Sequence, residues 1–217
     1  MVNLQPALAK EKFNTISHSL GAIAALIGTI VLASQIGDPM EKLVAAVFGA
    51  CSVIVFTFSG LYHFKKKKDD EVSVWRKIDH FGIFFTIAGT FTPLCYVYTE
   101  GAMRIGIITA QWVFVGLGIL FKVKFMDAPR WMSLGVYVLM GLMAVIPLSQ
   151  LLNGLAETGT VALAYFWTAL VAIILGISVY GSKKPNPKPE SFGFHGIWHV
   201  LVIVSQLFLF LLMFEIF

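Results

Sequence analysis

Charged residues are scarce in this sequence, and their scarcity excludes a soluble protein. Only 13% of the 217 residues carry a charge, 58% are hydrophobic, and the mean hydropathy is +0.82. Ordinary soluble domains have about 25% charged and about 45–50% apolar residues. A soluble fold would have to hide far too much apolar surface, so we expect a membrane protein.

Cysteine is equally scarce. Cys51 and Cys95 lie inside apolar runs, where a thiol behaves as a small hydrophobic group. Two cysteines are too few for a disulfide framework or a cysteine-based metal site. Internal repeats, low-complexity tracts and long polar segments are also missing, so we expect one membrane domain over residues 1–217.

The sequence has instead seven apolar stretches without a formal charge. A helix crosses a bilayer with about 20 apolar residues, and about 17–25 are tolerated. A span must satisfy its backbone internally, and no period-2 alternation indicates barrel strands, so we expect an all-α bundle of seven transmembrane helices. The stretches are residues 16–36, 43–62, 81–98, 105–121, 131–152, 161–180 and 194–214.

Small residues and prolines within these stretches predict features of helix packing. Glycines let neighbouring helices approach closely, and we expect Pro93 and Pro147 to kink their helices. The glycines are Gly21, Gly28, Gly116, Gly118, Gly135 and Gly141.

Basic residues predict the orientation of the bundle. Of the 16 lysines and arginines, all but Lys42 and Arg104 lie on one side, before the first stretch or after every second one. The positive-inside rule then predicts a cytoplasmic N-terminus and an external C-terminus. The same loops account for the net charge of +4, so we expect no nucleic-acid partner.

All five histidines lie at the predicted cytoplasmic ends of the stretches. His195 and His199 are four residues apart at the start of the last stretch, so in a helix both imidazoles share one face, with Cβ atoms about 5–6 Å apart. Zinc-binding helices use this spacing for their two histidines. The alternative is a pair of interfacial histidines that contact water and lipid headgroups.

Three further residues extend this pair into a candidate site. His63 ends the second stretch at the same depth, and Ser59 lies one turn deeper on its face in the string SGLYH. Asp79 opens the third stretch, where it either serves the site or caps the helix. A catalytic zinc site uses three protein ligands at about 2.0–2.1 Å and leaves a fourth position to water. We therefore expect His63, His195 and His199 to bind Zn²⁺.

The remaining polar residues have expected roles around this ion. Asp79 would accept a hydrogen bond from the bound water and act as general base, with Ser59 as a supporting catalytic residue. His80 points about 100° away from Asp79 around the helix, which makes it a poorer ligand. We expect His18, in the string NTISH with Asn14 one turn earlier, at most to support the ligands. Its alternatives are a headgroup contact and helix packing.

Four strings carry a family resemblance across nearly the whole chain: NTISHSLG, SGLYH, RKIDHFGIFFTIAGTFTP and HGIWH. They resemble the hemolysin-III-like bacterial branch of the progestin and adipoQ receptor family, and the wider superfamily that contains the alkaline ceramidases. The resemblance implies that His63, His195 and His199 hold zinc near the cytoplasmic leaflet, that Asp79 holds or activates its water, and that Ser59 supports them. It also implies a bacterial plasma membrane and a role in membrane lipid composition and fluidity.

Three functions compete for this site. We expect a zinc hydrolase that acts on an amide or ester of a lipid entering between the helices. The alternative is a non-catalytic sensor in which a structural zinc joins the helices. A pore-forming cytolysin ranks last. A conducting path would need ionisable residues along its depth, and the outer half of the predicted spans is almost free of them. The sequence lacks the soluble N-terminal domain of the adiponectin receptors, and its predicted external loops are short. We therefore expect no protein hormone as a ligand. The sequence predicts no particular oligomeric state.

Overall fold

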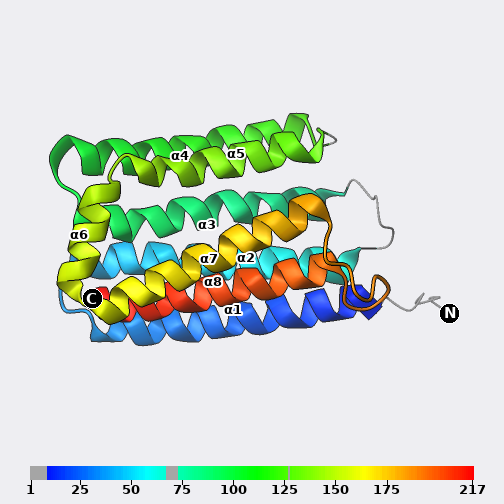
Figure 1. The fold of residues 1–217 in the computed structure, drawn as a ribbon, viewed down its shortest axis with the longest axis horizontal. Helices are drawn as coiled ribbons and strands as arrows, with labels where there is room; N and C mark the ends of the chain where they lie inside the picture. The colour runs from blue at the N-terminus through cyan, green and yellow to red at the C-terminus, as the bar shows by residue number, and fades with distance from the viewer. Residues whose placement is uncertain (1–8, 67–72, 127) are drawn as a thin grey trace.

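The computed structural model describes residues 9–66, 73–126 and 128–217, which form a bundle of helices (Figure 1). Apart from an isolated bridge between Lys188 and Phe192, these residues contain no β-structure. The helices are α1 (Ala9–Gln35), α2 (Pro39–Lys65), α3 (Val74–Tyr98), α4 (Gly101–Lys124), α5 (Arg130–Leu142), the 3₁₀ turn η1 (Met143–Val145), α6 (Leu148–Thr158), α7 (Thr160–Ser182) and α8 (Phe194–Ile216).

Helix length and composition make this a multi-pass membrane protein. Among the described residues, six helices are long and apolar enough to cross a bilayer: α1, α2, α3, α4, α7 and α8. The count rises to seven if α5 and α6 together form one bent span. The expectation of an all-α membrane bundle is confirmed.

The stretch expected to span at 131–152 is broken rather than merely kinked. α5 ends at Leu142, a 3₁₀ turn follows, and α6 starts after Pro147 at an angle of 67°. Proline has no N–H to donate and its ring clashes with the preceding turn, so a helix cannot run through it without strain. In Figure 1, α6 runs across one end of the bundle. Pro93, in contrast, lies within an uninterrupted α3.

Half of the glycines expected at helix contacts lie at such contacts. A Cβ on Gly21 would sit 3.0 Å from the Phe56 ring, and one on Gly118 would sit 2.5 Å from the Phe84 ring. Gly28 faces an aromatic ring in the same way. For the other three the expectation was wrong, because no heavy atom lies within 4 Å of their Cβ positions: Gly116, Gly135 and Gly141.

Three apolar clusters hold the described part of the bundle together. The largest joins α1, α2, α7 and α8, with contributions from α3 and α6, around side chains such as Leu32, Phe48 and Leu212, each 1% exposed or less. The second joins α3, α4 and α5 around Phe84 and Met140, and the third joins α3 and α4 around Cys95. Close packing of this kind fixes the helices along their length and so sets which helix ends meet.

The site depends on one end of the bundle, which we call the histidine end. Here α2 finishes, and α1, α3 and α8 begin (Figure 1). α2 starts at the opposite end, where the Asp38 carboxylate accepts hydrogen bonds from the backbone N–H groups of Met40 (2.8 Å) and Glu41 (2.9 Å). α3 starts after Ser73, whose hydroxyl accepts from the Arg76 N–H at 3.3 Å.

Candidate metal centre

Three imidazoles meet at the histidine end and form what we call the histidine trio: His63 from α2, and His195 and His199 from the first turns of α8. Their ring centroids lie 4.7–5.1 Å apart in every pairing, and one nitrogen from each lies within 4.8 Å of the others. His63 and His199 are each 1% exposed, and His195 is partly buried. Three histidines this close together could hold a metal ion.

The spacing of two nitrogens tests whether the trio fits an ion. His63 Nε2 and His195 Nε2 are 3.3 Å apart. Two nitrogens bound to one tetrahedral ion at about 2.0–2.1 Å lie about 3.3–3.4 Å apart. Two facing imidazole lone pairs repel each other unless a proton or a cation lies between them. The spacing of this pair is therefore compatible with a small divalent cation, as it is with a direct N–H···N hydrogen bond.

Behind His63 lies a carboxylate that the sequence analysis did not single out. Glu11, in the first turn of α1, is 3% exposed. Its Oε2 is 2.5 Å from His63 Nδ1, and its Oε1 accepts a hydrogen bond from Lys66 Nζ at 2.8 Å. The signal for Glu11 was its place three residues before Asn14 and seven before His18, a spacing that puts all three on one helical face.

Asp79 and Ser59 lie beside the trio and interact with each other. The Asp79 carboxylate lies close enough to Ser59, His63 and Arg76 to interact with all three. Because α3 begins at Val74, Asp79 lies in the second turn and does not cap the helix. Among the described residues, only the three histidines of the trio have ligand atoms close enough together to share one ion. Asp79 therefore lies near the candidate ion position but is not one of its ligands.

A buried polar patch adjoins the trio on the α1 side. His18 is 3% exposed, and its ring stacks on His199 with centroids 3.7 Å apart. Asn14, one turn earlier, is 2% exposed. In the part of the chain that the structure describes, neither nitrogen of His18, nor Asn14 Oδ1, nor His199 Nδ1 has a hydrogen-bond partner of normal geometry. Water or a polar ligand group commonly satisfies such atoms in proteins.

His80 belongs to a different polar cluster. Its Nδ1 pairs with the Tyr137 hydroxyl at 3.1 Å, and nearby Lys122 donates to the Ser133 hydroxyl at 2.5 Å. His80 is absent from the group of potential ligands found among the described residues. This agrees with the expectation that it is a poorer ligand than the trio.

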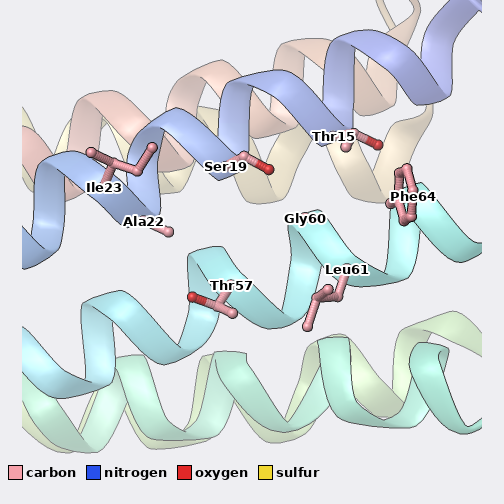
Figure 2. A pocket seen from close by; sticks show the side chains of 8 residues that line it. All are labelled: Thr15, Ser19, Ala22, Ile23, Thr57, Gly60, Leu61 and Phe64. Carbon is pink, nitrogen blue, oxygen red and sulfur yellow. The ribbon is translucent and has the colours of Figure 1, made fainter.

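The outward face of α1 and α2 carries a shallow groove of about 310 Å³ (Figure 2). Thr15 and Ser19 from α1 and Thr57 from α2 line it, together with apolar side chains. On α1, Asn14 and His18 are buried on the side of the trio. Thr15 and Ser19 line the groove instead. α1 therefore has two polar faces, one toward the trio and one toward the groove. No member of the trio lines this groove.

Known proteins resemble this chain over most of its length. A family model described as "Haemolysin-III related" matches residues 7–210. The protein named "Hemolysin-3 homolog" from Bacillus subtilis (strain 168) is 28% identical over 202 residues, which cover 90% of this chain and 89% of that protein. "Hemolysin-3" from Bacillus cereus is 26% identical over 214 residues, which cover 97% and 93%.

The similarity extends to an animal protein. "Monocyte to macrophage differentiation factor" from Homo sapiens is 21% identical over 207 residues, which cover 93% of this chain and 82% of that protein. The family model, which matches residues 7–210, covers the three histidines of the trio.

Proposed function

This chain belongs to the haemolysin-III-related family, as its resemblance to the hemolysin-III-like branch indicated, and from that premise we propose that it is a membrane-embedded zinc hydrolase of a lipid amide or ester. One observation carries the proposal: three imidazoles at ion-binding distance lie beside a carboxylate that is not among their ligand atoms. A hydrolytic metal centre needs both kinds of group, because one set of side chains holds the ion and a separate side chain moves the proton.

The residues of the chain would divide the work as follows. The trio would hold Zn²⁺, which when bound would supply Lewis-acid chemistry. Asp79 would accept a proton from the water that attacks the carbonyl carbon, and would return it to the leaving nitrogen or oxygen. Ser59, which interacts with Asp79, would donate a hydrogen bond to that carboxylate and keep it turned toward the site.

A lipid is the substrate class that the surroundings favour. The trio lies within helices whose outer faces are rich in exposed leucine, isoleucine and valine, so a substrate that reaches it laterally comes from the bilayer. The amide or ester of such a lipid lies at the headgroup level, which is also the depth expected for helix ends carrying lysine and arginine. Cleavage there would change membrane lipid composition and fluidity.

The proposed placement is the plasma membrane of a bacterium, with the histidine end in the cytoplasm. The Bacillus relatives support the bacterial setting. Lysines and arginines near the starts of α1, α3 and α8 support a cytoplasmic histidine end, and only Lys42 and Arg104 lie near the other. In this arrangement the whole chain acts as one membrane domain, with neither nucleic acid nor a protein hormone as partner.

Zinc content and lipid turnover test the proposal together. Purified wild-type protein should contain about one zinc per chain and should cleave a ceramide or a phospholipid supplied in vesicles, with products measured by mass spectrometry. Replacing Asp79 with Asn should lower turnover about 100-fold or more, because the general base is lost, while zinc content stays at the wild-type level.

The adjacent histidine provides the matched control. His80→Asn alters the neighbouring side chain, which faces Tyr137, and should leave both zinc content and turnover close to wild type. A zinc-free wild type would contradict the metal centre. A wild type that binds zinc but cleaves none of the supplied amide and ester lipids would contradict the hydrolase.

The second candidate is a sensor in which the metal is purely structural. The burial of His63 and His199 favours it, as does the position of the trio between α2 and α8, where an ion would join two helices far apart in the sequence. In that case His63→Ala should remove the metal and lower the melting temperature of a protein that turns over no lipid. The lytic activity that the names of the relatives suggest receives less support. A pore needs ionisable residues along the depth of the membrane, whereas charged groups away from the histidine end, such as Glu100 and Arg104, lie at helix ends.

A further inference from the structure

The carboxylate of Glu11 uses both of its oxygens at the histidine end. Oε2 lies 2.5 Å from Nδ1 of His63, and Oε1 lies 2.8 Å from Nζ of Lys66. The Glu11 side chain is only 4% exposed, so water does not compete strongly for it. Glu11 is also absent from the group of potential ligands among the described residues, so its contact with the site runs through His63.

This contact determines which nitrogen of His63 faces the other two rings. A neutral imidazole has one N–H donor and one lone-pair acceptor, and an ionised carboxylate can only accept. In a neutral His63 beside an ionised Glu11, the short contact requires the proton to be on Nδ1, where it is donated to the carboxylate. The lone pair is left on Nε2, the atom that lies 3.3 Å from Nε2 of His195.

Within the described parts of the chain, His63 is the one ring of the trio with an ion pair to a carboxylate. Nδ1 of His199 has no hydrogen-bond partner among the described residues. His63 is thus the ligand whose tautomer and ring orientation an acid fixes, and that acid comes from α1, a helix that supplies no member of the trio. Carboxylates in this position commonly orient metal-bound histidines and make them better donors.

We propose that Glu11 is a positioning residue of the metal centre: it holds His63 with Nε2 toward the ion and makes α1 part of the site. This proposal rests on the metal centre of the proposed function but not on any lipid chemistry. The competing explanation is that Glu11 merely joins α1 to α2 through its ion pair with Lys66.

Two variants separate these explanations. Glu11→Met keeps a similar volume but cannot accept from His63, and Lys66→Gln removes the ion pair while leaving the carboxylate in contact with His63. If Glu11 positions the ligand, Glu11→Met raises the Zn²⁺ dissociation constant about 10–100-fold in competition with a chromophoric chelator. The Zn²⁺ dissociation constant of Lys66→Gln should then stay within about threefold of the wild-type value, well below the 10–100-fold change expected for Glu11→Met.

Further variants control for charge and fold. Glu11→Gln retains an oxygen that can accept from His63, so it should bind Zn²⁺ more tightly than Glu11→Met. Glu41→Gln removes a first-turn glutamate from α2, at the end away from the trio, and should match wild type. With Co²⁺ in place of Zn²⁺, the visible absorption of Glu11→Met should differ from that of wild type, while that of Lys66→Gln should not.

A measurement on the wild type guards against a Glu11→Met protein that does not fold. In ¹⁵N-histidine spectra of the Cd²⁺-loaded protein, His63 should carry its proton on Nδ1 and couple to ¹¹³Cd through Nε2. Coordination through Nδ1 would overturn the proposal, as would equal loss of affinity in Glu11→Met and Lys66→Gln, or no loss in Glu11→Met. A wild type that binds neither Zn²⁺ nor Cd²⁺ would instead refute the proposed metal centre itself.

Discussion

His18 and His199 stack on each other, yet we expect them to differ in metal binding. Their ring centroids are 3.7 Å apart, but only His199 contributes a nitrogen to the trio. Both nitrogens of His18 lack partners of normal geometry among the described residues. Replacing an unpaired buried polar group with an apolar one of similar shape can be nearly neutral for stability.

The two positions therefore predict opposite results for the same substitution. His18→Leu should keep the wild-type zinc content, with an affinity within about threefold, since no ligand is removed. His199→Leu should lose the metal. Zinc analysis of the two purified proteins, with their melting temperatures in detergent, checks this. Loss of zinc from His18→Leu would show instead that the His18 ring is needed to hold His199 in place.

The sequence could identify the trio but not the residue behind it. Spacing along one helix placed His195 and His199 on one face, and hydropathy placed His63 at the same depth. Glu11 was overlooked because its significance depends on α1 lying against α2, and a pattern along one helix does not say which helix it packs on. The alternative of Asp79 as a cap failed for a local reason, since Ser73 already caps α3.

At the scale of helices, α1 and α2 approach each other closely at Gly49. A Cβ at this position would lie 2.1 Å from Thr29 Oγ1, and that hydroxyl is held in place by a hydrogen bond to the Ala25 carbonyl at 2.6 Å. Neither the backbone nor the threonine can yield easily. The close packing of α1 against α2, which brings Glu11 to His63, thus depends on a glycine at position 49.

Gly49→Ala should therefore destabilise the protein by about 1–3 kcal/mol through overpacking. Gly116→Ala is the matched control, because no heavy atom lies within 4 Å of its Cβ position and alanine is favoured over glycine in a helix by about 0.5–1 kcal/mol. Unfolding midpoints of both variants in one detergent check the prediction. An unchanged midpoint for Gly49→Ala would contradict the close approach of α1 and α2.

Helix packing was only partly readable from the sequence. Hydropathy located the apolar stretches because apolar length is a local property. Whether a glycine faces a neighbouring helix or the lipid is not local, which is why Gly21 and Gly118 pack against rings while Gly116 does not. Pro147 was expected to bend its helix, but the size of the break depends on α6 finding its own place across the end of the bundle.

At the scale of the whole molecule, the distribution of charge predicts the orientation in the membrane. Alkaline phosphatase is active only outside the cytoplasm, so a fusion after Phe217 should be active and a fusion after Lys124 inactive. The reason is that 16 basic residues are divided very unevenly between the two ends, with only Lys42 and Arg104 at one of them. The reverse pattern of activities would place the trio on the external side.

The distance along the chain between the members of the trio has a consequence for biosynthesis. His63 lies in the second helix and His199 in the last, and chains emerge from the ribosome with the N-terminal part first. A nascent chain therefore presents one imidazole, already oriented by Glu11 once α1 and α2 have paired, long before its two companions exist. If the trio binds an ion as proposed, only a finished and fully inserted polypeptide can retain it, and metal occupancy then distinguishes mature molecules from truncated or stalled ones.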